Sequence, residues 1–315
     1  MIPCPTCAGT GYRAGARECF VPRPGKVFFQ ADFPQLELYT LAQCCTTWLG
    51  SSRLADALNA GLDPHMQVAA LILGISYEEA KKRKNKNHPE SKALDNARQT
   101  GKVANFGFPG GLGIDSLISY AKKGYGVELT RTKAKHLKET WLTAWPEMQW
   151  YFQRVNGFCE AGGGKATVET LFTKRTRGRA SYCAACNNGF QALGADCAKA
   201  AWWEITKACY GADPYGPSSN GGAGNPLNGS RIVAMVHDEF IGECDDDDPR
   251  AHDVAHELAR LMVVGANRYL PDVPIPLSKM EPLLMRRWSK NAEPTFALVG
   301  GERRLVPWAS KEKGK

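Results

Sequence analysis

The stretch Val27-Phe28-Phe29-Gln30-Ala31-Asp32-Phe33-Pro34-Gln35-Leu36-Glu37-Leu38 joins two kinds of secondary structure. Residues 27–33 are rich in β-prone and aromatic side chains, whereas residues 36–49 show the apolar spacing of a helix. The sequence therefore predicts that Asp32 lies where a strand gives way to a helix.

A second aspartate has a comparable place far along the chain. Residues 232–236 and 240–243 are short β-prone runs on either side of His237-Asp238-Glu239, a pattern typical of a hairpin with acids at its tip. We expect helices over 192–210 before this hairpin and over about 250–269 after it.

The intervening part of the chain shows mainly helical periodicity. The expected helical segments are 54–60, 66–73, 77–84, 97–106, 114–123 and 133–155.

Composition narrows the class of protein. The chain has 315 residues, of which 43% are hydrophobic, and its formal net charge is +8, which suits a polyanionic partner. The sequence contains no apolar run of membrane-spanning length and no secretory signal, so we expect a cytoplasmic protein without a membrane partner.

The eleven cysteines favour reduced thiols over a disulfide framework. Cys4 and Cys7 have the spacing of one arm of a zinc ribbon, and Cys183 and Cys186 could supply the other arm. Buried thiols packed in a helix are the favoured alternative for the second pair.

Arg98, Lys102 and Phe106 lie at i, i+4 and i+8, which places two cations and an aromatic ring on one helix face. Two aligned cations can clamp a phosphate chain, although a solvated basic face has the same spacing. Gly107, Gly110 and Gly111 follow, where a backbone approached by a nucleotide or base pair tolerates no bulk.

Three motifs together resemble family A DNA polymerases, the bacterial DNA polymerase I type. Residues 32–38 are similar to motif A, residues 98–111 to motif B and residues 236–239 to motif C, in the family's order. Asp63-Pro64-His65 and Glu169-Thr170-Leu171-Phe172 match supporting segments of the family, and a bacteriophage-like member is expected.

The resemblance implies an α+β right-hand fold, with an antiparallel palm sheet and an inserted helical fingers subdomain. The expected domains are 1–45 (palm, motif A), 46–180 (fingers, motif B) and 181–315 (palm, motif C). The chain begins 31 residues before Asp32, so the family's thumb and exonuclease domains are expected to be absent from it.

The resemblance also implies the chemistry. A primer 3′-hydroxyl would attack the α-phosphate of a deoxynucleoside triphosphate (dNTP) and release pyrophosphate, with two Mg²⁺ ions as cofactors. Asp32 and Asp238 are the expected metal ligands and catalytic residues, with Glu239 a weaker ligand candidate, and Lys102 is the third expected catalytic residue.

Substrate contacts follow from the same motifs. Arg98, Lys102 and His65 would hold the triphosphate. Phe106 would lie beside the sugar and base, Glu37 would close the pocket at the 2′ position, and Gln35 is a further expected substrate contact. The expected contacts to primer–template DNA are Asn187, Gln191, His237, Gly110 and Gly111.

Several features depart from the family pattern, among them Tyr39 and Cys183, which stand where arginines are common in the family. Gly110 stands where the family usually has a tyrosine near the templating position. Lys81, Lys82, Arg83, Lys84 and Lys86 form a basic run in a segment longer than the usual spacing, which suits either a template contact or a solvated linker.

Three alternatives remain open from the sequence. The chain could be a catalytically incomplete, nucleic-acid-binding half of a split polymerase that needs a thumb- or exonuclease-bearing partner. A single-subunit RNA polymerase is disfavoured because Glu37 would crowd a 2′-hydroxyl. Reverse transcription is not separable by sequence, because template choice depends on groove shape.

Overall fold

The computed structural model describes residues 16–211, 224–246 and 249–308, which divide into two compact units. The described part of the first, the sheet unit, comprises residues 16–34, 198–211, 224–246, 249–266 and 275–308. The second, the helical unit, comprises residues 35–197 and 267–274. The helix α9 (Tyr182–Tyr210) contributes many residues to both units, and α10 (Ala251–Asn267) contributes only its last residue to the helical unit.

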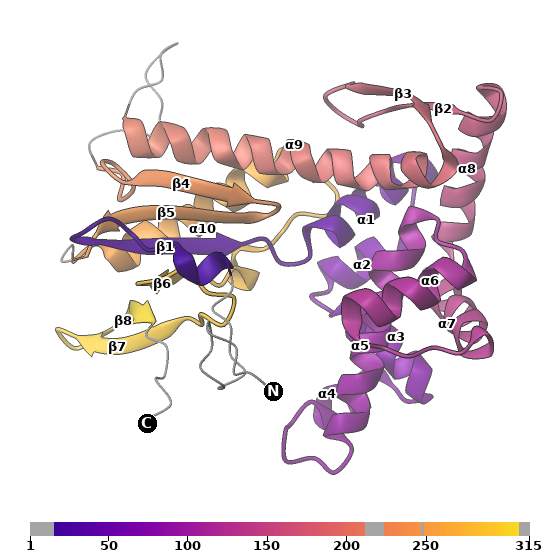
Figure 1. Ribbon diagram of the computed structural model, residues 1–315, viewed down its shortest axis with the longest axis horizontal. Coiled ribbons are helices and arrows are strands. Elements are labelled where there is room, and N and C mark those ends of the chain that lie inside the picture. Colours follow the sequence, from indigo (N-terminus) through magenta and orange to yellow (C-terminus); the bar gives the residue numbers. More distant parts are fainter. Residues whose placement is uncertain (1–15, 212–223, 247–248, 309–315) are drawn as a thin grey trace, which may run out of the picture. The chain divides into compact units, whose positions relative to one another are not determined.

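The sheet unit contains six strands in the order β4-β5-β1-β6-β8-β7 (Figure 1). All neighbouring strands are antiparallel except β6 and β8. The strands are β1 (Lys26–Asp32), β4 (Arg231–Val236), β5 (Glu239–Asp245), β6 (Leu283–Met285), β7 (Thr295–Val299) and β8 (Glu302–Trp308).

Two helices pack within the sheet unit. Trp202 of α9 contacts the ring of Phe240 on β5, with ring centroids 6.0 Å apart. The helix α10 (Ala251–Asn267) approaches α9 so closely that a Cβ at Gly265 would lie 2.4 Å from the Ala201 backbone. Only glycine allows this helix–helix contact. Two 3₁₀ turns, η1 (Ala16–Cys19) and η4 (Leu277–Lys279), also belong to this unit.

The pairing of β1 with β5 has a sharply defined register. Asp32 lies opposite Glu239 and Phe29 lies opposite Gly242. A Cβ at Gly242 would lie 2.1 Å from the ring of Phe29 and 2.8 Å from the Arg231 carbonyl oxygen. The Phe29 ring, which is fully buried, therefore occupies the space that a side chain at position 242 would need.

The helical unit contains eight α-helices besides α9, together with the β2–β3 hairpin (Figure 1). The helices are α1 (Leu36–Leu49), α2 (Arg53–Asn59), α3 (Pro64–Leu73), α4 (Tyr77–Arg83), α5 (Ser91–Gly107), α6 (Ile114–Tyr120), α7 (Arg131–Ala144) and α8 (Glu147–Ala161). The remaining elements are η2 (Phe108–Gly110), the π-turn η3 (Ala121–Tyr125), β2 (Ala166–Glu169) and β3 (Thr176–Ala180).

The α+β class predicted from the sequence is confirmed, and β1, α1, β4, β5 and α10 lie where it placed them. The single helical segment predicted over 133–155 is wrong, because the chain breaks between α7 and α8 at Trp145 and Pro146. Proline has no backbone N–H and starts a helix more readily than it continues one.

The domain boundaries predicted at residues 45 and 180 stay predictions, since compact units need not coincide with functional subdomains. Within the described residues, no helix is both long and apolar enough to cross a membrane.

We expect Gly242→Ala to destabilise the sheet unit by about 1–3 kcal/mol, because the new methyl group must displace the buried Phe29 ring or the Arg231 backbone. Urea unfolding of the purified variant measures this loss. Gly157→Ala in α8 is the matched control, since nothing lies within 4 Å of the Cβ that it adds. Equal stability of the two variants would contradict the packing argument.

Candidate functional site

Asp32 and Asp238 are brought together by the end of the β1–β5 ladder. Beyond the last strand pair, the Phe33 N–H donates to the carbonyl oxygen of Asp238 at 3.2 Å. Asp238 belongs to a two-residue turn between β4 and β5, in which His237 has a φ of 59°. A non-glycine residue in this left-handed region is uncommon and is often found at functional sites.

The two aspartates line an open pocket of about 520 Å³ within the sheet unit. Its wall also carries basic side chains, Arg17, Lys279 and Lys290, and three further acids, Glu239, Glu281 and Glu293. Negative and positive groups thus face the same space, which can accommodate a polyanion only near a bound cation or the basic wall.

The two carboxyl groups perturb each other. Although Asp32 as a residue is exposed, protein atoms surround much of its carboxyl group, and this desolvation raises its pKa to about 7, with the negative charges of Asp238 and Glu239 adding to the rise. Desolvation also raises the pKa of Asp238. A hydrogen bond joins the two carboxyl groups, which requires a proton on one of them.

Glu239 lies beside the pair but is held by other partners. One oxygen accepts from Nη1 of Arg17 at 2.9 Å and the other accepts from Nε1 of Trp288 at 2.7 Å. The Arg17 guanidinium also lies 4.5 Å from the centroid of the Trp288 ring. To bind a metal ion, Glu239 would have to release one of these partners, so its weaker ligand role stays a prediction.

A second group of charged residues lies in the helical unit. The Arg98 guanidinium contacts Oδ2 of Asp63 through Nε at 2.9 Å and through Nη2 at 2.7 Å. Asp63 also caps α3 by accepting from the His65 N–H at 2.9 Å. Burial opposes ionisation of Asp63, but the charge and hydrogen bonds of Arg98 outweigh it, so the pKa of Asp63 is lowered.

Lys102 lies one turn beyond Arg98 on α5. Desolvation lowers its pKa, and the nearby Arg98 charge lowers it further. In the part of the chain that the structure describes, no carboxylate forms an ion pair with Lys102. Its ammonium group is therefore available to an anion from solution.

The orientation of His65 is set by a buried network around Asn105. The Oδ1 atom of Asn105 accepts from Nε1 of Trp141 at 2.9 Å and from Nε1 of Trp145 at 3.0 Å. The amide nitrogen of Asn105 therefore faces Nδ1 of His65, 3.0 Å away. Since an amide nitrogen only donates, Nδ1 must accept, and a neutral His65 carries its proton on Nε2.

His65 is only 2% exposed, and its ring lies 5.1 Å from that of Phe106. Desolvation, the main cause, together with the Arg98 and Lys102 charges, lowers its pKa to about 4 against the opposing charge of Asp63. Its predicted phosphate contact would therefore be made by a neutral imidazole.

The predicted nucleic-acid contacts of motif B meet those of α9. A Cβ at Gly110 would lie 2.7 Å from Oδ1 of Asn187, and one at Gly111 would lie 3.0 Å from the ring of Tyr182. Gly111 also has a φ of 77°. The tyrosine usual in the family at position 110 would therefore displace Asn187, whose amide nitrogen instead donates to the Cys183 carbonyl oxygen at 2.9 Å.

The residues around α1 form another predicted group. Nε2 of Gln191 donates to Oε1 of Glu37 at 3.4 Å, so the structure places these two predicted contacts side by side. Gln35 precedes α1 with a φ of 56°, and its side chain makes no capping hydrogen bond to α1. Phe106 is half-buried on α5.

The sequence located the motifs but did not indicate which other side chains form hydrogen bonds with the motif residues. Asn105 stood inside the quoted motif, but nothing in its spacing indicated that Trp141 and Trp145 would converge on it. Arg17 carried no signal either, because its partner Glu239 lies 222 residues away.

The structure describes only the second of the two cysteine pairs in the zinc hypothesis. Cys4 and Cys7 lie outside the described residues. Cys186 is buried, as the thiol-packing alternative predicted, whereas Cys183 is exposed. Both belong to α9 as free cysteines, and the structure leaves the metal role of the first pair untested.

Comparison with known proteins decides the family. A sequence model described as DNA polymerase family A matches residues 2–279. The chain belongs to DNA polymerase family A. Motif C lies in the sheet unit and motif B in the helical unit, whereas motif A is divided, with Asp32 in the sheet unit and Glu37 in the helical unit.

The relatives are bacterial proteins named DNA polymerase I. The protein from Aquifex aeolicus is 27% identical over 277 residues, which cover 87% of this chain and 41% of that protein. The protein from Lactococcus lactis is 26% identical over 237 residues, covering 71% of this chain and 22% of that protein. The chain therefore spans less than half the length of these relatives, and they lend no support to the expected bacteriophage origin.

The fold agrees with the family. The solved structure titled "POL domain of Pol1 from M. smegmatis complex with DNA primer-template and dNTP" matches with a TM-score of 0.61 at 22% identity. The match covers 86% of this chain and 42% of the other.

We expect His65 to make stability fall with acidification. The folded state takes up the His65 proton only near pH 4, whereas the unfolded chain takes it up near pH 6.5, so protons favour unfolding between these values. The effect reaches up to about 3 kcal/mol at low pH.

Urea unfolding over pH 4–7 tests this, and His65→Gln should reduce the slope. The exposed His136→Gln is the control and should leave the slope unchanged. An unchanged slope in the His65 variant would mean that the folded protein accommodates a charged His65.

Proposed function

We propose that this chain carries the catalytic part of a DNA-directed DNA polymerase, a nucleotidyltransferase of DNA replication. The primer 3′-hydroxyl attacks the α-phosphate of a dNTP, the bond to the β-phosphate breaks, and pyrophosphate leaves. The observation that carries the proposal is the carboxyl pair of Asp32 and Asp238, from strands β1 and the β4–β5 turn, at one pocket.

The residues present fit Mg²⁺ as the cofactor. Two carboxyl groups that share a proton and repel each other offer hard oxygen ligands, which a divalent cation binds in place of that proton. Asp32 and Asp238 would hold two Mg²⁺ ions, which supply charge neutralisation at the phosphate and activation of the primer hydroxyl. Glu239 joins them only if it releases Arg17 or Trp288.

The helical unit supplies the substrate contacts in this proposal. Lys102 and Arg98 bind the triphosphate, with the ammonium of Lys102 neutralising the charge that develops on the leaving group. The neutral Nε2–H of His65 donates a further hydrogen bond. Phe106 lies against the sugar and base, and Glu37, with Gln35, borders the 2′ position.

Primer–template DNA is the proposed macromolecular partner. Asn187, Gln191 and His237 contact the DNA near the primer end, and Gly110 and Gly111 lie against α9 at the same contact surface, with Gly110 beside Asn187. Support comes from the motif matches and from the packing of both glycines against α9.

Substitution of either aspartate by asparagine should reduce primer extension on the order of a thousandfold or more, while the urea unfolding midpoint stays near that of the parent chain. Asp32→Asn and Asp238→Asn are measured by single-turnover extension in excess Mg²⁺.

The control is Asp245→Asn at the opposite end of β5, where an exposed carboxylate pairs with Lys26. Near-parent rates in either aspartate variant would refute the ligand assignment. If the unsubstituted chain extends primers only beside a thumb- or exonuclease-bearing protein, the split-polymerase alternative holds instead.

Glu37→Ala should admit ribonucleotides. Shortening the wall at the 2′ position relieves a steric clash, so the kcat/KM for a ribonucleotide relative to its deoxy counterpart should rise about tenfold or more. Gln191→Ala, which removes the hydrogen-bond partner of Glu37 and keeps the carboxylate, should change this ratio less. An unchanged ratio in Glu37→Ala would remove Glu37 as the sugar gate.

A further inference from the structure

The segment from α4 to the start of α5 is basic, with two lysines on α4 and two in the loop that follows it. Lys81, Lys82, Lys84 and Lys86 are all exposed, and none makes an ion pair within the described residues. We call these four side chains the lysine cluster. Figure 1 shows α4 and this loop at one end of the helical unit.

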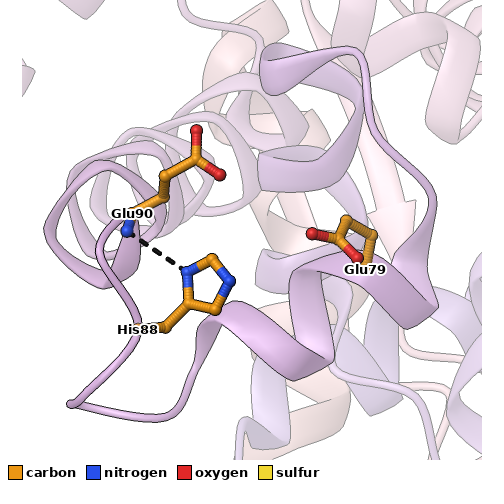
Figure 2. Close-up of side chains that lie close together, drawn as sticks. All are labelled: Glu79, His88 and Glu90. Atoms are coloured by element: carbon orange, nitrogen blue, oxygen red, sulfur yellow. Dashed lines mark hydrogen bonds between the residues drawn. The ribbon is translucent and has the colours of Figure 1, made fainter.

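Internal contacts hold the loop in shape. The Arg83 guanidinium pairs with Glu79 at 3.0 Å and with Glu90 at 2.8 Å, so one cation joins the two ends of the segment. Figure 2 shows Glu79 reaching toward the ring of His88, whose Nδ1 accepts from the Glu90 N–H at 3.2 Å.

Glu79, His88 and Glu90 have the composition of a cation site, and their ligand atoms lie within 4.8 Å of one another. Arg83 already supplies the positive charge that the two glutamates need. The three residues therefore act as a brace, and the lysine cluster is what the loop offers to solution.

The position of the loop on α5 indicates its ligand. The helix begins at Ser91 next to the loop, and Arg98, Lys102 and Phe106 follow in that order along it. A nucleotide with its base at Phe106 and its phosphates at Lys102 and Arg98 points its phosphate chain toward the loop. At 1.5 Å of rise per residue, Arg98 lies only about 10 Å along the axis from the start of the helix.

We propose that the lysine cluster captures the anionic phosphate chain of the incoming dNTP electrostatically and guides it to Arg98 and Lys102. This inference rests on the proposed function, because it takes the direction of the nucleotide from it. Between residues 78 and 98, seven basic side chains outnumber four acidic ones, which gives the approach path a positive potential. A field of this kind raises the association rate without changing the chemical step.

The loop is unsuited to holding single-stranded DNA by base stacking. Residues 81–92 contain no phenylalanine, tyrosine or tryptophan, and such side chains are the stacking platforms of that class of site. A DNA backbone contact is the competing role, and the experiment separates the two.

The test replaces Lys81, Lys82, Lys84 and Lys86 together by glutamine and measures single-nucleotide incorporation of dTTP on saturating primer–template. We expect kcat/KM for dTTP to fall about three- to tenfold with kcat and the Kd for DNA unchanged, and the difference to shrink as salt rises. Replacement of Lys123, Lys133, Lys135 and Lys165, four exposed lysines of the same unit, removes equal charge elsewhere and should have a smaller effect.

Making the approach path more positive, by removing acidic side chains, should raise kcat/KM for dTTP. Glu78→Gln combined with Asp95→Asn removes two exposed acids beside the path and leaves the Arg83 brace intact, so kcat/KM for dTTP should rise. An unchanged or lowered value overturns the inference. Two other outcomes also overturn it. One is weaker DNA binding by the variant of the lysine cluster with unchanged dTTP kinetics, and the other is an equal fall of kcat/KM for dTTP in the control variant.

A second readout does not depend on turnover. Calorimetric titration of the chain with inorganic tripolyphosphate should show weaker binding for the variant of the lysine cluster than for the control variant. If the lysine cluster strengthens tripolyphosphate binding but the chain does not extend primers, the proposed function fails and only the polyphosphate site itself remains. If the chain extends primers but the lysine cluster affects neither kcat/KM for dTTP nor tripolyphosphate binding, the inference is overturned and the proposed function stands.

Discussion

The antiparallel pairing of β1 with β5 is the constraint on which the candidate site depends. It joins segments more than 200 residues apart in sequence, and its last hydrogen bond, from Phe33 to Asp238, sets the two aspartates side by side. A slip of one residue would turn Asp32 to the other face of the sheet. The fit of Phe29 over Gly242 opposes such a slip, because at any other register the buried ring would meet a side chain. Packing in the sheet interior thus determines the geometry at its edge.

The same geometry places in one pocket two carboxyl groups that disfavour each other's ionised form. Two desolvated carboxyl groups at one strand end repel each other, and the raised pKa of Asp32 expresses that cost. Glu239 avoids the problem through Arg17 and Trp288, which take up both of its oxygens. Asp32 and Asp238 interact with each other and with nearby backbone groups, but no lysine or arginine of the described residues forms an ion pair with either. Such a carboxyl pair can bind a cation that arrives with the substrate. Glu239, by contrast, already pairs with the Arg17 side chain.

Much of this could be predicted from the sequence, and the exceptions share a physical cause. Local signals located β1, α1, the β4–β5 hairpin and α10, and motif order assigned the family. The break at Pro146 had a local signal that helical periodicity on both sides obscured. Strands β6, β7 and β8 and the Asn105 network were not anticipated. Short strands are stabilised mainly by their neighbours, and Asn105 acquires its role only when Trp141, Trp145 and His65 converge on it from other helices.

Arg98 and Lys102 on α5 differ in ion pairing, and this difference bears on which anions they can bind. Arg98 is neutralised by Asp63, so an incoming anion must compete with a carboxylate that also caps α3. Lys102 has no such partner in the described structure. A singly charged anion gains little by displacing Asp63, because one ion pair is exchanged for another of similar strength. A triphosphate can engage Lys102 first and then offer Arg98 a second, more highly charged partner. Under the proposed function, this ion pair would make the site prefer a triphosphate to a singly charged anion.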